Sequence, residues 1–149
     1  MKIVEVSALS PQLIQDLLKV WESSVKATHL FLSNDEIQKI KGYIPEALAS
    51  VAHLIIIENE IGQPVGFMGI NNHFLEMLFI ADAHRGKGLG KQLLEYGINK
   101  YSVNKLDVNE QNPLARGFYE RMGFSVYQRS ALDGQGNPYL HLAHVKRLK

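Results

Sequence analysis

The chain has 149 residues, of which 46% are hydrophobic and 21% charged, a balance typical of a single globular domain over residues 1–149. Its formal net charge is +1 and it has no basic run, which argues against a nucleic-acid-binding protein. It contains no cysteine, which excludes a disulfide scaffold, a cysteine nucleophile and a thiolate metal site.

The first half of the chain predicts a strand, a helical region and an antiparallel meander. Residues 2–6 alternate between polar and apolar and indicate a strand, after which Ser10-Pro11 starts a helix. Ser33 and Glu36 have the spacing of a capping box, and Pro45 is expected to break the helix that follows. Residues 53–57, 64–70 and 73–80 are three apolar segments separated by turns, which favours a meander.

The second half predicts two more helices among three strands. A glycine-rich loop leads into one helix, and Asn112-Pro113 starts another that ends near Gly123. Strands are expected at 105–108, 124–131 and 139–145, the last two joined by a turn at 133–138. The order predicts an α/β fold, with a mixed, mostly antiparallel sheet of seven strands and about four helices on its two faces. No apolar stretch exceeds about five residues, against the roughly 20 that span a bilayer, so we expect a cytoplasmic protein.

The loop Arg85-Gly86-Lys87-Gly88-Leu89-Gly90 indicates an anion site. The first amides of a helix lack intrahelical acceptors, and glycines let the backbone approach a phosphate closely. A pyrophosphate fits this pattern, and a glycine-rich helix start without a ligand is the structural alternative. No Ser or Thr follows Gly90-Lys91, so the nucleoside-triphosphate loop lacks its magnesium ligand, and the dinucleotide pattern Gly-x-Gly-x-x-Gly is absent.

Two motifs resemble those of one enzyme family. Arg85-x-x-Gly88-x-Gly90 after an apolar strand is similar to the CoA-binding motif of the GNAT superfamily of N-acetyltransferases. Asn112-x-x-Ala115-x-x-x-Tyr119, followed by Gly123-Phe124, resembles its second signature, about 20 residues further on. The expected element order matches the acyl-CoA N-acyltransferase fold over essentially the whole chain. Residues 24–32, 108–112 and 136–139 resemble a group of small bacterial acetyltransferases.

The resemblance implies acetyl-CoA as cosubstrate, with its pantetheine arm along the strand before the loop. A splay between that strand and residues 105–108 is expected to form the slot where the acetyl group meets the amine. Asn112 is implied to contact the cofactor arm, a role compatible with capping its helix. The predicted cofactor-binding residues are Leu78, Phe79, Ile80, Arg85, Gly86, Lys87, Gly88, Leu89, Gly90, Asn112 and Tyr119.

Tyr119 is the predicted proton donor to the departing CoA thiolate, as the family match implies, whereas its spacing alone favours a core tyrosine. Glu76 is a candidate base, directly or through water, and the alternative is a solvated strand residue. Asp107 is a weaker candidate base.

Acceptor-site candidates lie in and near the connection after the first helix. His29 is expected at the substrate site, against a helix-capping role, and its pKa range also suits proton transfer. Trp21 and Phe31 are candidate walls of the acceptor pocket, although core positions are commoner for such residues. The six histidines have no metal-ligand spacing, so we expect no metal.

The predicted function is an acetyl-CoA-dependent N-acetyltransferase in which a primary amine attacks the thioester directly. The acceptor is open between a protein lysine, a protein N-terminus and a small amine. The alternative is a non-catalytic acyl-CoA-binding or sensing module, and a phosphotransferase is disfavoured by the loop. No nucleic-acid or membrane partner is expected, and a monomer and a homodimer are both compatible with the sequence.

Overall fold

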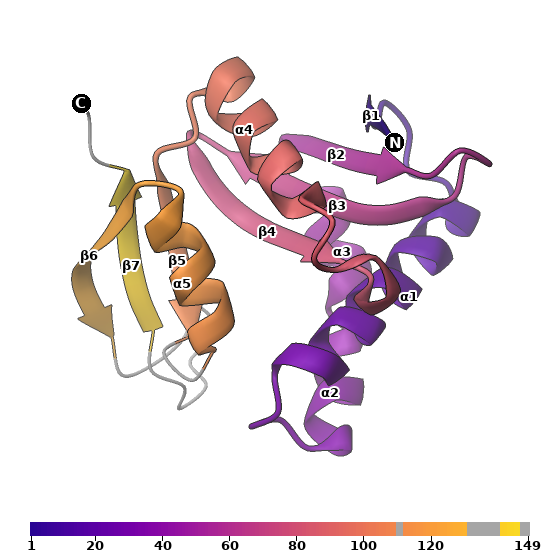
Figure 1. The fold of residues 1–149 in the computed structure, drawn as a ribbon. Coiled ribbons are helices and arrows are strands. Elements are labelled where there is room, and N and C mark those ends of the chain that lie inside the picture. The colour runs from indigo at the N-terminus through magenta and orange to yellow at the C-terminus, as the bar shows by residue number, and fades with distance from the viewer. Residues whose placement is uncertain (110–111, 131–140, 147–149) are drawn as a thin grey trace.

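The computed structural model describes residues 1–109, 112–130 and 141–146, and shows one mixed sheet flanked by helices (Figure 1). The strands are β1 (Lys2–Glu5), β2 (His53–Glu58), β3 (Pro64–Asn71), β4 (Phe74–Ile80), β5 (Lys105–Asn109), β6 (Phe124–Ser130) and β7 (His141–Lys146). They are hydrogen-bonded in the order β1-β2-β3-β4-β5-β7-β6, and every neighbouring pair is antiparallel except β4 and β5. The predicted mixed, mostly antiparallel sheet is therefore confirmed. The predicted turn at 133–138 and the start of the last predicted strand lie outside the described residues.

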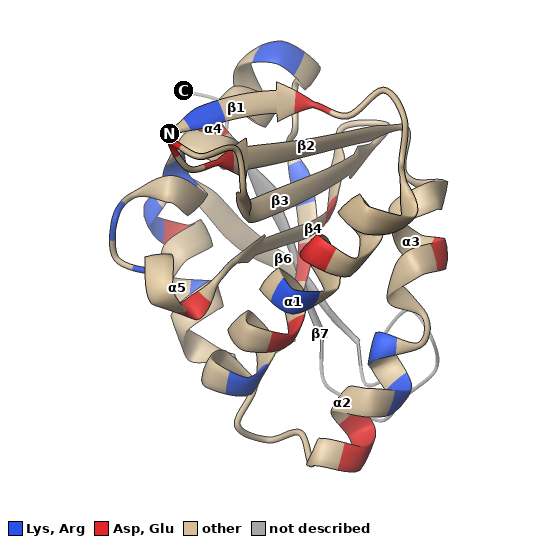
Figure 2. Cartoon of the chain, turned by 90° about the vertical axis from the view of Figure 1, so that its right-hand side faces the viewer, with Lys and Arg blue, Asp and Glu red and all other residues tan. Residues whose placement is uncertain are grey.

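Three of the described helices begin at side-chain caps that the sequence predicts, at Ser10, Ser33 and Asn112. The described helices are α1 (Pro11–Thr28), α2 (Asn34–Lys41), α3 (Ile44–Ser50), α4 (Leu89–Tyr101) and α5 (Pro113–Arg121), with a short 3-10 turn η1 (Asp82–His84) before α4. Ser10 Oγ accepts the Leu13 N–H at 3.1 Å, and Ser33 and Glu36 form the predicted capping box. Pro45 lies in the first turn of α3, so the predicted break is also confirmed. Figure 2 shows α2 acidic where it begins and basic near its end, as its dipole favours.

The sheet separates two hydrophobic cores. Ile55 and Ile57 of β2 point into the core that contains α4 and α5, whereas Leu54 and Ile56 point into the core beneath α1, α2 and α3. Alternate residues of one strand therefore serve opposite faces, which explains why β2 is a continuous apolar run. Within the described residues, no helix combines the length and apolar character needed to cross a bilayer.

The parallel pair β4 and β5 is short, and this shapes the functional site. Only Phe74 with Lys105 and Leu75 with Leu106 are in register. Beyond them β4 stays paired to β3 and β5 to β7, while the two strands diverge from each other (Figure 1). The predicted splay is therefore present, and it divides the sheet into two wings. One wing consists of β1 to β4, and the other of β5 to β7.

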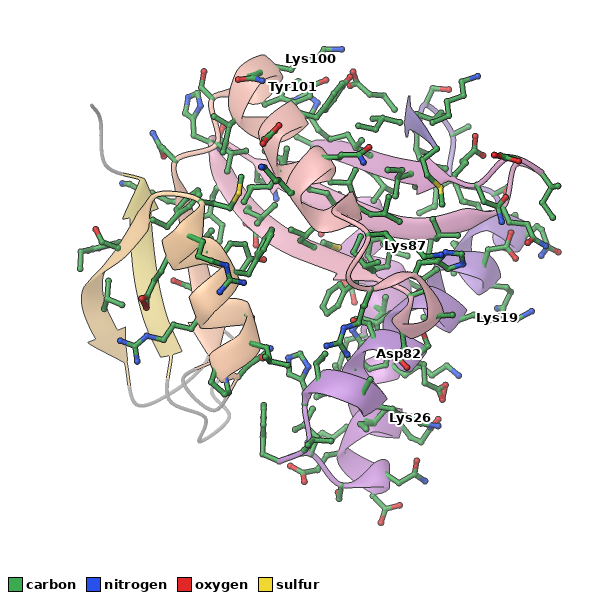
Figure 3. All side chains as sticks on the ribbon, in the orientation of Figure 1. Lys19, Lys26, Asp82, Lys87, Lys100 and Tyr101 are labelled. Carbon is green, nitrogen blue, oxygen red and sulfur yellow. The ribbon has the colours of Figure 1, made fainter. Side chains whose placement is uncertain are left out.

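A polar cluster far from this splay fastens the end of α4 to the edge strand β1. Glu5 accepts hydrogen bonds from Lys100, Tyr101 and Tyr96, and these bonds lower the pKa of its carboxyl to about 2. Figure 3 shows Lys100 and Tyr101 together at this end, well separated from Lys87 near the start of the helix. The cluster stabilises the fold and takes no part in the cleft described next.

Candidate functional site

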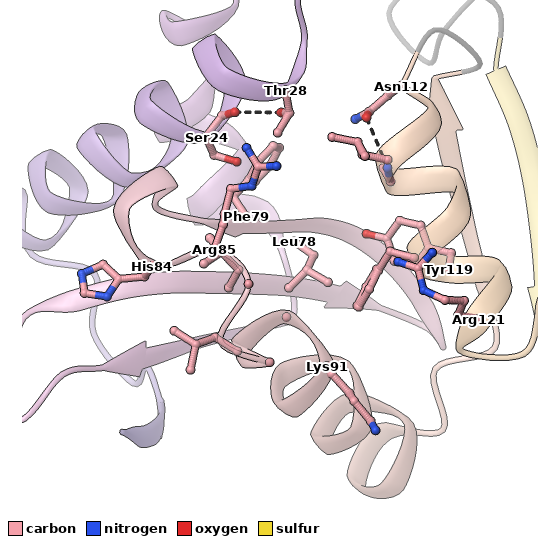
Figure 4. A pocket seen from close by; sticks show the side chains of 18 of the residues that line it. Ser24, Thr28, Leu78, Phe79, His84, Arg85, Lys91, Asn112, Tyr119 and Arg121 are labelled. Atoms are coloured by element: carbon pink, nitrogen blue, oxygen red, sulfur yellow. Dashed lines mark hydrogen bonds between the residues drawn. The ribbon is translucent and has the colours of Figure 1, made fainter.

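A cleft of about 390 Å³ lies between the end of α1, the loop after β4, the start of α4 and helix α5 (Figure 4). Of the predicted cofactor residues, those lining it are Leu78, Phe79, Ile80, Arg85, Gly86, Gly88, Leu89, Gly90, Asn112 and Tyr119. Lys87 is exposed and is not among the residues that line the cleft. Its side chain therefore contributes less directly to the cleft than its position in the motif suggested. The other predicted cofactor residues all line this one concave surface.

The N-terminus of α4 opens into this cleft without a side-chain cap. Its N-cap is Gly88, in the left-handed region at φ 77°, and its first turn contains no acidic residue. Ser10, Ser33 and Asn112 instead cap α1, α2 and α5 with side-chain oxygens. Uncapped amide groups and the helix dipole make this terminus an anion site.

The amide N–H groups of residues 86–91 have no acceptor within the described part of the chain. The first intrahelical bond runs from the Gln92 N–H to the Gly88 carbonyl at 3.0 Å. The Arg85 N–H is already donated to the Asp82 carbonyl at 3.2 Å, so the free donors start one residue later than the motif suggested. Gly86 and Gly88 both have positive φ, 76° and 77°, which aligns successive amides in a way that side-chain-bearing residues resist.

The charges around the cleft favour a polyanion. Arg85, Lys91 and Arg121 line it, and no Asp or Glu is among its described lining residues. Arg85 also bonds the Asp82 carboxylate at 3.1 Å, which partly neutralises its charge. Sequence reasoning missed Arg121. The signal was the spacing of Leu114, Phe118 and Arg121, which places all three on one face of α5.

A smaller cavity of about 120 Å³ occupies the slot between the diverging strands β4 and β5. The two exposed carboxylates of Glu76 and Asp107 line it, and no Lys or Arg is among its described lining residues. The walls shared with the larger cleft are His29, Leu78, Phe79, Asn112, Ala115 and Tyr119. A cationic compartment thus meets an anionic one at the splay.

Tyr119 stands at this junction. Its side chain is 9% exposed, and its ring packs edge-on against Phe118 and Phe124, with centroids 5.1 and 6.2 Å away. Burial raises the pKa of its hydroxyl above the ordinary value, so the group keeps its proton at neutral pH. No hydrogen-bond partner of this hydroxyl lies among the described residues. The tyrosine is both a core residue and a protonated group facing both cavities.

The three predicted acceptor-site residues have different positions. His29 lines both cavities, and burial lowers its pKa to about 4. Phe31 packs against the His29 ring with centroids 5.5 Å apart, and lines neither cavity. The prediction that Trp21 forms a wall of the pocket is wrong, because Trp21 is 2% exposed and packs in the core beneath α1. No metal-binding group of three or more His, Asp or Glu occurs in the described residues.

The chain is similar to known acetyltransferases. Residues 10–141 match the family model described as an acetyltransferase (GNAT) domain. Peptidyl-lysine N-acetyltransferase YjaB of Escherichia coli is 40% identical over 137 residues, covering 88% of this chain and 90% of the relative. The solution structure of apo YjaB from Escherichia coli superposes with a TM-score of 0.84 at 34% identity, covering 97% of each chain. The PaiA N-acetyltransferase of Thermoplasma acidophilum, solved with coenzyme A, shares the fold at TM-score 0.65 and 21% identity, over 99% of this chain and all of that one.

Proposed function

Because this chain belongs to the GNAT acetyltransferase family and is an acyltransferase, we propose that it transfers an acetyl group from acetyl-CoA to the side-chain amine of a peptidyl lysine. The observation that carries the proposal is the uncapped N-terminus of α4, which opens into a cleft with no carboxylate among its described lining residues. The amides of residues 86–91 are the groups that would hold the cofactor pyrophosphate, supported by Arg85.

The pantetheine arm would lie along the edge of β4 that β5 leaves open after Leu75. Backbone groups of Leu78, Phe79 and Ile80 are the candidates to hydrogen-bond it, since this edge faces both cavities. In this arrangement the thioester reaches the junction at Tyr119, and the acceptor amine enters from the slot.

The proposed reaction is a direct transfer. The lysine ammonium loses a proton to Glu76, directly or through water, and the neutral amine attacks the thioester carbonyl. The new N–C bond forms in a tetrahedral intermediate, and the C–S bond then breaks. Tyr119 gives its proton to the departing CoA thiolate, and the second proton that the attacking nitrogen loses as the amide forms passes through solvent to restore the Tyr119 hydroxyl. Asp107, across the slot from β4, is the alternative base.

One feature supports a lysine acceptor over a protein N-terminus or a small amine, and a second is compatible with it. The name of the YjaB relative specifies peptidyl lysine, and that relative is 40% identical over most of its length. The carboxylates of Glu76 and Asp107 give the slot a negative potential, which attracts a cationic amine such as the lysine ammonium. The alternative of a non-catalytic acyl-CoA-binding module gains no support, since the family and its relatives are enzymes.

The test supplies acetyl-CoA with peptides that differ only in having lysine, a free N-terminus or neither, alongside a panel of small amines. Acetylation is measured as CoA thiol release and located by mass spectrometry. We expect acetyl-lysine, and a kcat for Tyr119→Phe that is lower by on the order of 10²- to 10⁴-fold with acetyl-CoA affinity retained. Tyr43→Phe, at an exposed tyrosine outside the cleft, is the matched control. Normal turnover by Tyr119→Phe would remove this residue from the mechanism, and transfer only to small amines would overturn the lysine assignment.

A further inference from the structure

A chain of hydrogen bonds links the end of α1 to the start of α5 at the wall shared by the two cavities. The Thr28 hydroxyl donates to the Ser24 carbonyl at 2.7 Å, and its oxygen lies 2.9 Å from His29 Nδ1. His29 Nε2 lies 3.3 Å from the side-chain nitrogen of Asn112, which is 83 residues away in sequence. Figure 4 shows Thr28 and Asn112 on the two separate elements, α1 and the start of α5, that this chain of bonds connects.

The two ends of the chain fix the position of every proton in it. The Ser24 carbonyl only accepts, so the Thr28 proton points to it and the Thr28 oxygen is left to accept from His29 Nδ1–H. At the other end, the Ala115 N–H only donates, at 3.3 Å, so it must face Asn112 Oδ1. The Asn112 NH₂ group therefore faces His29, and the Nε2 lone pair accepts from it.

His29 is consequently a neutral imidazole with both ring nitrogens engaged. A proton added to Nε2 would point at the Asn112 NH₂ group, and burial already lowers the pKa of the ring to about 4. Phe31 packs against the ring. The lone pair that a general base would use is occupied, so His29 is poorly suited to take a proton from the acceptor.

Asn112 gains a defined orientation from this bond. Its side chain is 6% exposed and lines both cavities. Its oxygen caps α5, and its nitrogen carries two N–H groups, of which His29 accepts one. The second N–H has no acceptor among the described residues, so it is available to a cofactor carbonyl.

We propose that His29 is a positioning residue, with Thr28 fixing its tautomer, and that it holds the Asn112 amide so that one N–H is presented to acetyl-CoA. The proposal rests on the proposed function for the identity of the ligand, and its geometry is independent of the acceptor. It assigns the base role to the slot carboxylates and removes it from His29.

Two pairs of variants separate positioning from base catalysis. His29→Ala removes the acceptor of the Asn112 N–H, whereas His29→Gln places an amide oxygen near the position of Nε2 without a titratable group. We expect His29→Ala to raise KM and Kd for acetyl-CoA about three- to tenfold, with a smaller effect on kcat, and His29→Gln to recover most of that loss. Thr28→Val should act in the direction of His29→Ala, and Thr28→Ser should restore binding.

The pH profile of kcat/KM provides the second readout. Titratable groups that share a cavity with His29 are Glu76 and Asp107 in the slot, and Tyr119, His84, Arg85, Lys91 and Arg121 around the larger cleft. We expect His29→Gln to keep the shape of the wild-type profile, because these groups remain. Loss of the acidic limb in His29→Gln would identify His29 as the base and overturn the proposal. Wild-type KM and Kd in His29→Ala, or no recovery in His29→Gln, would also overturn it.

A third measurement needs no variant and no acceptor. Long-range ¹⁵N–¹H correlation spectra of the wild-type imidazole at pH 7 should show His29 protonated at Nδ1 alone. An Nε2–H tautomer or an imidazolium would contradict the proposal. If no lysine peptide is acetylated, this spectrum and the calorimetric Kd for acetyl-CoA still decide the role of His29. Failure of the His29 proposal can therefore be distinguished from failure of the acceptor assignment.

Discussion

Replacing Gly88 with alanine tests whether the loop backbone approaches the cofactor closely. Gly88 has φ 77°, and a Cβ built there meets no atom within 4 Å, so the methyl group would project into open space at the cleft wall. Gly62, in the turn between β2 and β3, offers a matched control, because it has φ 80° and equally open surroundings but lies outside the cleft. The left-handed conformation costs an L-residue about 1 to 2 kcal/mol, so both variants should lose roughly 1 kcal/mol or more of unfolding free energy.

The expected melting temperatures fall by about 2 to 4 °C per kcal/mol for a chain of this length, alike in the two variants. Only Gly88→Ala should also weaken acetyl-CoA binding, by on the order of tenfold, since a methyl group there separates the amides from the pyrophosphate. Urea unfolding measures the first effect and calorimetry the second. Equal affinity in Gly88→Ala and Gly62→Ala would refute the backbone site.

Three further predictions concern titratable groups. Because the pKa of His29 falls from an ordinary 6.5 to about 4 on folding, the unfolded chain binds the proton first as the pH drops. Wild type should therefore lose about 2 kcal/mol of unfolding free energy between pH 7.5 and 4.5, and a similar loss in His29→Gln, measured by urea titration, would contradict this. The pKa of Glu5 is lowered to about 2, chiefly by its bond from Lys100, so its stabilisation is present above pH 4.5 and is lost toward pH 2. Glu5→Gln should lower the melting temperature at pH 7 and flatten its decline over that acid range, and an unchanged melting curve would argue against the cluster. Glu76→Gln should reduce kcat/KM more than Asp107→Asn without altering acetyl-CoA affinity, and the reverse order would make Asp107 the base.

Local signals in the sequence predicted most of the fold. Ser10, Ser33 and Asn112 mark helix starts because their side chains accept backbone N–H groups within three residues, an interaction that spacing alone reveals. The glycine loop could be predicted for the same reason, since Gly88, the N-cap of α4, has no side chain that could accept from the first amides of the helix.

Contacts between distant segments could not be predicted in this way. The His29–Asn112 bond joins positions that periodicity treats as unrelated, and it changes the interpretation of His29 from a candidate base to a neutral bridge. The prediction that Trp21 forms a pocket wall was wrong because the face of α1 that carries Trp21 packs against the sheet. Only the packing of α1 determines which of its faces is buried. His84 lines the cleft and has a buried Nδ1 without a partner among the described residues, and no pattern in the sequence indicates either property.

The brief parallel pairing of β4 and β5 also has a consequence for backbone dynamics. The middle of a sheet ordinarily exchanges its amide hydrogens most slowly, because ladders protect it on both sides. Here β4 lies in the middle of the strand order yet loses one ladder after Leu75. Slot-facing amides in β4 and β5 should exchange with deuterium quickly in the free protein, and become protected when the cofactor arm supplies the missing partners.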